Sequence, residues 1–182
     1  MAGSELIFIS GGVRSGKSAY AEKLIREHGS SERLYLASGQ KGDAEMDERI
    51  HKHRRDRQFD GWTTIEAQVK FERVVEDIPE GAAVLWDCVT TWLANELYAG
   101  WEHGTPCVET EGCMERKWQE LQMTIARIRV RASLFVIVSN EVLDEPIKDP
   151  SYQRWLGRIH IWLASEAVQA IEMESGLAFH RK

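Results

Sequence analysis

The chain has 182 residues, of which 43% are hydrophobic and 29% charged, so its length and composition predict one soluble globular domain over residues 1–182. Acidic residues outnumber basic ones, 29 to 23, and the net charge of −6 argues against a protein that binds nucleic acid through a basic surface. The apolar runs are far shorter than the ~20 residues that cross a bilayer, and residues 1–5 lack the basic start of a signal peptide, so we expect a cytoplasmic protein.

Short apolar runs alternate with segments of helical composition along the chain. We expect a buried strand at 6–10, a helix at 19–28 and a second strand at 33–37. Helices are expected at 43–57 and 67–76, a strand at 82–86, a helix at 90–98, a long loop at 100–112, a helix at 114–131, a strand at 134–139 and a helix at 152–170. The chain then ends in a hairpin that turns at Ser175 and Gly176. This order predicts an α/β fold, with a mainly parallel sheet flanked by helices and a C-terminal β-hairpin.

The three cysteines predict neither a disulfide framework nor a zinc site. Cys88, Cys107 and Cys113 are few and scattered, and no two of them form a CxxC pair. We therefore expect all three to be reduced.

A glycine-rich loop between the first strand and the first helix carries the strongest local signal. Its residues fit G-x-x-x-x-G-K-[ST] without a mismatch: Gly11, Gly12, Val13, Arg14, Ser15, Gly16, Lys17 and Ser18. Such a loop wraps a phosphate chain with backbone amides at a helix N-terminus. Lys17 is expected to reach the β- and γ-phosphates, and the Ser18 hydroxyl to bind Mg²⁺. The alternative is a plain turn with a solvated Lys17, but the strand–loop–helix context favours a P-loop NTPase-type (RecA-like) fold.

A phosphate loop of this kind needs a second carboxylate on the magnesium side, at the end of a neighbouring buried strand. Asp87 ends the run A-A-V-L-W-D and is the best candidate. The alternative role for Asp87 is the N-cap of the helix expected at 90–98, and one residue can serve both roles.

A basic cluster at residues 49–57 stands out in this acidic chain. Four arginines, one lysine and two histidines fall within those nine residues. The plain alternative is a solvated helix face. The concentration of positive charge favours a polyanionic phosphate ligand, and a neutral imidazole is a good nitrogen nucleophile near pH 7.

Together these segments resemble the bifunctional adenosylcobinamide kinase / adenosylcobinamide-phosphate guanylyltransferase family of cobalamin biosynthesis. The matching segments, in family order, are G-G-V-R-S-G-K-S at 11–18, Y-L-A-S at 35–38, E-M-D-E-R-I-H-K-H-R-R-D-R at 45–57, W-T-T-I-E at 62–66, D-C-V-T-T-W at 87–92 and V-S-N-E-V at 138–142. The basic segment with its following W-x-T-x-E is far more specific than the phosphate loop alone.

The resemblance implies a two-step enzyme with one nucleotide site. A nucleoside triphosphate, GTP or ATP, phosphorylates adenosylcobinamide; GTP then guanylylates a histidine, and the GMP passes to the cobinamide phosphate. The catalytic residues implied are His53, which carries the GMP, and Lys17, with His51 a competitor of His53. The nucleotide contacts implied beyond the loop are Ala37, Ser38, Gly39, Arg54, Arg55, Asp56, Arg57, Glu66 and Asp87. The resemblance also implies Mg²⁺ at Ser18 and Asp87, a corrinoid substrate and a homo-oligomer, with a trimer favoured.

Two alternatives remain open at this point. One is a P-loop kinase for a different small alcohol, without nucleotidyl transfer; the other is a non-catalytic GTP- or ATP-binding module. The chain also departs from the family pattern at 143–146, where L-D-E-P replaces a glycine-rich stretch, and at 157–161, where no Asn-Gln pair follows Gly-Arg. These departures concern the corrinoid site and subunit contacts more than the nucleotide.

Overall fold

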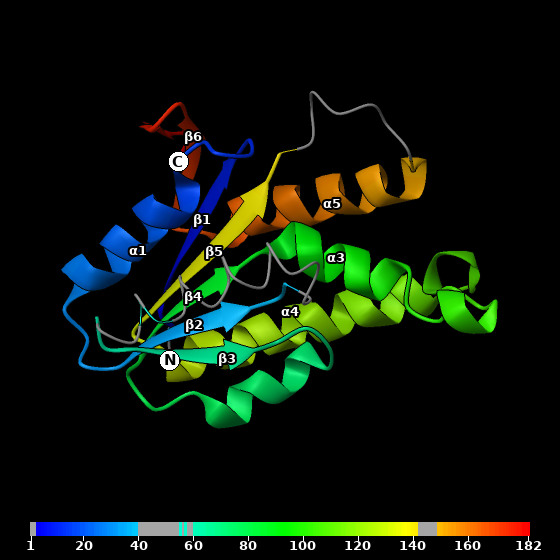
Figure 1. The fold of residues 1–182 in the computed structure, drawn as a ribbon, viewed down its shortest axis with the longest axis horizontal. Helices are drawn as coiled ribbons and strands as arrows, with labels where there is room; N and C mark the ends of the chain where they lie inside the picture. The colour runs from blue at the N-terminus through cyan, green and yellow to red at the C-terminus, as the bar shows by residue number, and fades with distance from the viewer. Residues whose placement is uncertain (1–2, 40–54, 56, 58–59, 142–148) are drawn as a thin grey trace.

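The computed structural model describes residues 3–39, 55, 57, 60–141 and 149–182, and the strands in these ranges form one sheet (Figure 1). The strand order is β3-β2-β4-β5-β1-β6-β7. All neighbouring strands are parallel except β6 and β7, which form an antiparallel hairpin. The strands are β1 (Glu5–Gly11), β2 (Arg33–Ala37), β3 (Trp62–Glu66), β4 (Ala83–Asp87), β5 (Leu134–Asn140), β6 (Gln169–Glu174) and β7 (Leu177–His180).

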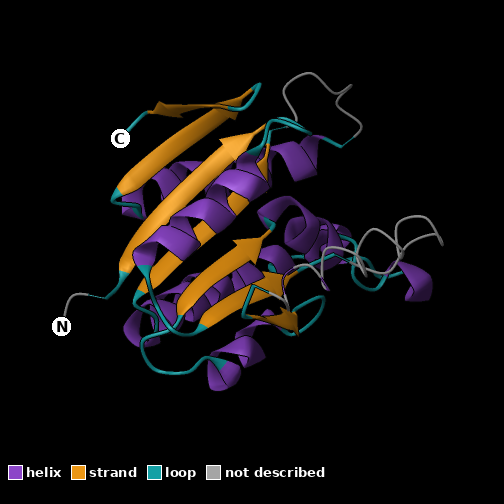
Figure 2. Cartoon of the chain, turned by 60° about the vertical axis from the view of Figure 1, so that its left-hand side comes forward, coloured by secondary structure: helices purple, strands orange, loops and turns teal. Residues whose placement is uncertain are grey.

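Helices cover both faces of this sheet (Figure 2). The α-helices are α1 (Lys17–His28), α3 (Val89–Leu97), α4 (Cys113–Arg131) and α5 (Pro150–Glu166), and the 3-10 helices are η1 (Phe71–Asp77), η2 (Trp101–His103) and η3 (Cys107–Glu109). Helix α1 packs on β1, β4 and β5 from one side, whereas α3, α4 and α5 lie on the other. The predicted α/β architecture, with its mainly parallel sheet and C-terminal hairpin, is confirmed.

The central strands are buried on both faces, and this explains their continuous apolar sequences. On β1, Leu6 and Phe8 join the core beneath α3, α4 and α5, while Ile7 and Ile9 join the core beneath α1. Because β1, β4 and β5 are parallel, their carboxyl ends meet at one edge of the sheet. The residues that follow these three strands are thereby brought together.

The predicted elements are wrong in four places. Trp62–Glu66 is an edge strand, which the prediction missed because its threonines break the apolar run. The helix predicted at 67–76 is replaced by the 3-10 helix η1, which starts only after Lys70 with its left-handed φ of 55°. The loop predicted at 100–112 contains η2 and η3, and α5 ends at Glu166 rather than Ala170. Of the helix predicted at 43–57, only Arg55 and Arg57 are described, and both are helical.

The expectation of three reduced cysteines is also wrong. Cys107 in η3 and Cys113 at the start of α4 form a disulfide, with their Cα atoms 5.5 Å apart. Successive turns bring them together: the Thr110 amide donates to the Cys107 carbonyl, and the Cys113 amide donates to the Thr110 carbonyl. Cys88 is a free, buried thiol. In the part of the chain that the structure describes, no helix is long and apolar enough to cross a membrane.

The indole of Trp86 is completely buried and links β4 to two other segments. Its Nε1 donates to Ser38 Oγ at 2.6 Å, and its ring stacks on Phe71 with centroids 4.3 Å apart. We expect Trp86→Ala to lower the free energy of unfolding by about 3–5 kcal/mol, because it leaves a cavity and an unpaired hydroxyl. Trp101→Ala is the control: that side chain is 66% exposed, and its loss should change stability by less than about 0.5 kcal/mol. Equal effects of the two variants in denaturant titrations would contradict this packing.

His160 on α5 is largely buried against β1 and β5. Its ring lies 5.2 Å from that of Phe8, its Nε2 shares a hydrogen bond with Ser139 Oγ at 2.7 Å, and burial lowers its pKa from 6.5 to about 4. Between these two values the unfolded chain binds a proton at His160 that the folded chain does not. Stability due to His160 is therefore full above pH 6.5 and falls as the pH drops towards 4, by at most about 1.4 kcal/mol per pH unit. We expect His160→Asn to flatten this part of the stability profile; parallel profiles for the variant and the wild type would refute the assignment.

Candidate active site

The glycine-rich loop joins the end of β1 to the start of α1 and is tightly packed. A Cβ on Gly11 would lie 2.5 Å from the Met173 carbonyl oxygen and 2.6 Å from Ser15 Oγ, so only glycine fits there. Gly16 precedes α1 with a left-handed φ of 91°, a conformation that glycine adopts without strain. The Gly176 amide, in the β6–β7 turn, donates to the Ser15 carbonyl at 2.9 Å. The C-terminal hairpin thus supports the loop from outside.

Lys17 turns back over this loop, as a phosphate-binding lysine should. Its Nζ donates to the Gly12 carbonyl at 2.9 Å, and only 7% of the residue is exposed. Burial lowers the pKa of Lys17, and the carboxylates of Asp87 and Glu141 oppose that shift. The Lys17 ammonium group is therefore close enough to Asp87, at the end of β4, and to Glu141, directly after β5, for both negative charges to act on it.

Asp87, at the end of β4, connects the loop to the rest of the sheet. Its Oδ2 accepts a hydrogen bond from Ser18 Oγ at 2.9 Å and another from the Tyr35 hydroxyl at 2.7 Å. The alternative role as a helix N-cap is wrong, because Cys88 occupies that position of α3. A hydroxyl and a carboxylate oxygen side by side are the kind of ligands that Mg²⁺ takes beside a nucleotide. The donor set therefore fits the ion that the sequence predicts.

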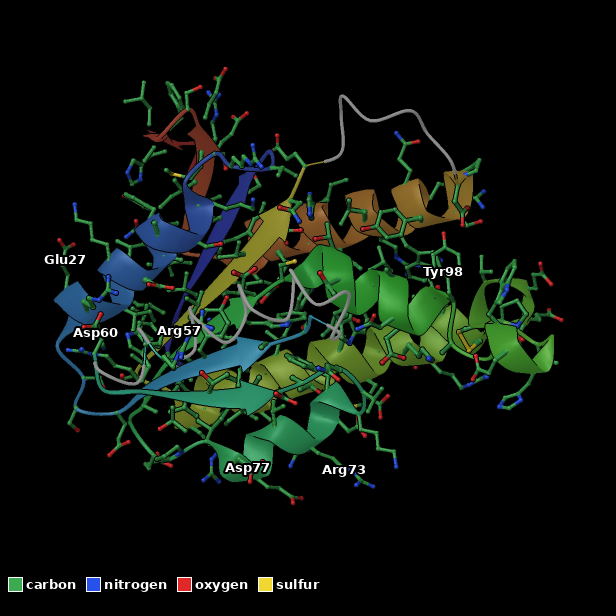
Figure 3. All side chains as sticks on the ribbon, in the orientation of Figure 1. Glu27, Arg57, Asp60, Arg73, Asp77 and Tyr98 are labelled. Atoms are coloured by element: carbon green, nitrogen blue, oxygen red, sulfur yellow. A yellow bond between two sulfur atoms is a disulfide. The ribbon has the colours of Figure 1, made fainter. Side chains whose placement is uncertain are left out.

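Tyr35 joins Asp87 to the basic cluster. Burial, followed by the nearby Asp87, raises the pKa of Tyr35 well above its ordinary value, so the phenol stays protonated and donates a hydrogen bond to the carboxylate. Arg57 is labelled in Figure 3. Its guanidinium lies 3.6 Å from the centre of the Tyr35 ring and 3.8 Å from Glu22 Oε1 on α1. Arg57 thus reaches the site through Tyr35, while Arg55 is exposed. The predicted His53, with Arg54 and Asp56 and its competitor His51, lies outside the described residues.

The predicted contacts at the ends of β2 and β3 line up beside Asp87. Ala37 is in register with Asp87 on one side and with Glu66 on the other. The Ser38 amide donates to the Asp87 carbonyl at 3.1 Å, and Ser38 is fully buried. Gly39 is exposed, and its carbonyl accepts from Gln68 Nε2. Ser38 therefore fixes the end of β4, and Gly39 presents its backbone at the surface.

Three residues at this site were not singled out by sequence reasoning. Tyr35 holds Asp87, while Asn140 ends β5 beside the loop and Glu141 follows it. Asn140 Nδ2 donates to Thr90 Oγ1 at 3.1 Å. The rule that ligands bind at the carboxyl ends of parallel strands could have indicated Asn140 and Glu141. Nothing in the sequence indicates the Tyr35 contact, because it joins two strands.

This fold, with a phosphate loop between its first strand and first helix, defines the class of P-loop NTPase-type proteins. Two solved structures share the fold. A prototypical ATPase from the type III secretion system of pathogenic bacteria superposes with a TM-score of 0.60 and 13% identity, over 97% of this chain and 57% of that chain. The assembled ATPase EscN of enteropathogenic E. coli superposes with a TM-score of 0.55 and 14% identity, over 98% of this chain and 48% of that chain. The chain thus spans about half the length of these ATPases, and such low identities show the fold alone.

The chain belongs to the cobinamide kinase / cobinamide phosphate guanyltransferase family, whose model matches residues 7–180. It is 33% identical to the bifunctional adenosylcobalamin biosynthesis protein CobU of Escherichia coli K12 over 178 residues, which cover 94% of this chain and 97% of that protein. The CobU protein of Salmonella typhimurium LT2 is 32% identical over 178 residues, which again cover 94% of this chain and 97% of that protein. CobP of Pseudomonas aeruginosa is 42% identical over 90 residues, or 49% of this chain and 51% of that protein. The resemblance predicted from the sequence is confirmed.

Proposed function

We propose that this chain phosphorylates adenosylcobinamide with a nucleoside triphosphate and then transfers GMP from GTP, through a guanylyl-histidine, to adenosylcobinamide phosphate, giving adenosylcobinamide-GDP. The observation that carries the proposal is the complete phosphate loop, with Lys17 folded over it and Ser18 joined to Asp87, in a chain that belongs to this family. Family membership favours this function over a kinase without nucleotidyl transfer and over a non-catalytic binding module.

In the kinase step, the loop amides and Lys17 hold the triphosphate so that its γ-phosphorus faces the acceptor hydroxyl. Phosphoryl transfer depends mainly on positioning and on stabilising charge at the phosphate oxygens. The buried Lys17 ammonium supplies that charge where little water competes with it.

Ser18 and Asp87 are the residues that would hold Mg²⁺. The ion, when bound, neutralises charge on the β- and γ-phosphates. Asp87 is oriented for this role by Tyr35, whose hydroxyl binds the same oxygen that faces Ser18. Tyr35 is itself fixed by the Arg57 guanidinium over its ring.

In the guanylyl step, a histidine nitrogen attacks the α-phosphorus of the GTP held in the same loop. The phosphorus–nitrogen bond forms as pyrophosphate leaves with the electron pair of the broken bond. A phosphate oxygen of the cobinamide phosphate then displaces the histidine. We assign the nucleophile to His53, on the spacing that the family shares. Arg54, Arg55, Asp56 and Arg57, with Ala37, Ser38, Gly39 and Glu66, complete the proposed nucleotide contacts in a cytoplasmic homo-oligomer, for which a trimer is proposed.

Replacing Asp87 tests the proposed magnesium ligand. Asp87→Asn keeps the shape of the side chain but removes its charge, so we expect half-maximal kinase activity to require at least about tenfold more Mg²⁺. Asp60→Asn is the matched control, because Asp60 is half-exposed and pairs with Arg26 away from the loop. Identical Mg²⁺ titrations for both variants and the wild type would remove Asp87 from the metal site.

Labelling with α-³²P GTP tests the proposed function as a whole. We expect the wild type to acquire label that is lost in acid and retained in alkali, as a phosphorus–nitrogen bond requires. Lys17→Ala should lose both labelling and cobinamide phosphorylation, whereas Lys23→Ala, exposed on the same helix, should keep both. His53→Ala should lose the label and keep phosphorylation, and His51→Ala should keep the label.

Two outcomes of this labelling would contradict the proposal. Label that maps to His51 would move the nucleophile. A wild type that phosphorylates cobinamide but never carries label would leave only a kinase.

A further inference from the structure

Glu141 is the first residue after β5, and it is held against the phosphate loop from two directions. Its backbone amide donates to the Gly11 carbonyl at 2.9 Å, and its Oε1 accepts from Ser10 Oγ at 2.8 Å. Ser10 and Gly11 are the last two residues of β1, directly before the loop turns. The carboxylate is thus fixed at the point where the loop begins.

The sheet order places this carboxylate on the Lys17 side of the site. Strand β5 lies between β4, which ends at Asp87, and β1, which leads into the loop. Asp87 and Glu141 are the two carboxylates that act on the Lys17 ammonium. Since Lys17 is expected to contact the β- and γ-phosphates, we expect Glu141 to lie near the transferred phosphoryl group.

The two carboxylates have different partners, which gives them different roles. Asp87 Oδ2 already accepts from Ser18 and Tyr35, on the side proposed for the metal. Glu141 accepts from Ser10 through one oxygen, and an ionised carboxylate has about four acceptor positions in all. Glu141 can therefore accept a hydrogen bond from a further donor.

We propose that Glu141 is the general base of the kinase step, an inference that rests on the proposed function. Its carboxylate accepts the proton of the acceptor hydroxyl while the hydroxyl oxygen forms a bond to the γ-phosphorus. The bond from that phosphorus to the β–γ bridging oxygen breaks, and the nucleoside diphosphate leaves with the electron pair. Glu141 then releases the proton to water. Ser10 is a positioning residue, because it holds one oxygen of this carboxylate.

The guanylyl half-reaction does not need this base. A neutral imidazole attacks with a nitrogen lone pair, so no proton has to leave before the new bond forms. Loss of Glu141 should therefore separate the two half-reactions, whereas loss of a residue that binds the triphosphate should impair both.

The test is Glu141→Gln, which keeps an acceptor for Ser10 and removes the base. We expect kcat for cobinamide phosphorylation to fall at least about 100-fold. The KM for the nucleotide and the rate of protein labelling from α-³²P GTP should stay within about threefold of the wild type. Ser10→Ala should lower the kinase kcat about tenfold, again with normal labelling. Glu76→Gln, exposed on η1, is the matched control and should change neither activity.

A second variant separates base catalysis from local structure. Glu141→Ala should lose kinase activity, and added formate, a small carboxylate that can occupy the space, should raise it again. Formate should have no such effect on Lys17→Ala.

Two results would overturn the assignment while leaving the proposed function intact: a kinase kcat in Glu141→Gln within threefold of an active wild type, or a parallel loss of phosphorylation and labelling. A wild type that does not phosphorylate cobinamide would instead overturn the proposed function, and the inference with it.

Discussion

The hydrogen bond between Ser18 Oγ and Asp87 Oδ2 joins the first turn of α1 to a strand that is not adjacent to β1. Strand β5 lies between β1 and β4, so this contact spans the carboxyl edge of the sheet. It can form only if β1, β5 and β4 end at the same level, which their parallel register ensures. The positions of Lys17, Tyr35 and Glu141 relative to the loop follow from the same alignment.

The two carboxylates at this edge of the sheet, Asp87 and Glu141, have different partners. Asp87 accepts hydrogen bonds from Ser18 and Tyr35, and the Arg57 guanidinium lies over the Tyr35 ring. Glu141 instead accepts from Ser10, the residue directly before the loop. In the proposed mechanism, one loop presents a bound triphosphate to two different nucleophiles. Glu141, proposed to act on the incoming hydroxyl, is separate from the groups proposed to hold the phosphates.

The sequence predicted the parts of the fold that depend on continuous apolar runs. The strands β1, β2, β4 and β5 were all expected within one residue of their observed bounds, because burial on both faces leaves a clear pattern. The edge strand β3 was missed, since it has a neighbour on one side only and carries threonines. The Cys107–Cys113 disulfide was missed as well, because the turns that bring the two residues together leave no spacing signal.

Candidate site residues were predictable where a local motif or the end of an apolar run marks them. Lys17 and Ser18 follow from the loop motif, and Asp87 follows from its place at the end of an apolar strand. The contacts of Tyr35 and Glu141 depend on which strands are neighbours, a property that the strand order determines and the local sequence does not. The position of Arg57 over Tyr35 also required the structure.

The central claim is that one phosphate loop serves both half-reactions, and competition by inorganic tripolyphosphate tests it most directly. This probe carries the phosphate chain without a nucleoside, so it competes only for the loop and its metal side. We expect it to inhibit cobinamide phosphorylation and protein guanylylation competitively with respect to the nucleotide, with inhibition constants equal within about twofold, a difference of roughly 0.4 kcal/mol. Inhibition of one half-reaction at concentrations that leave the other unchanged would show two nucleotide sites and contradict the account.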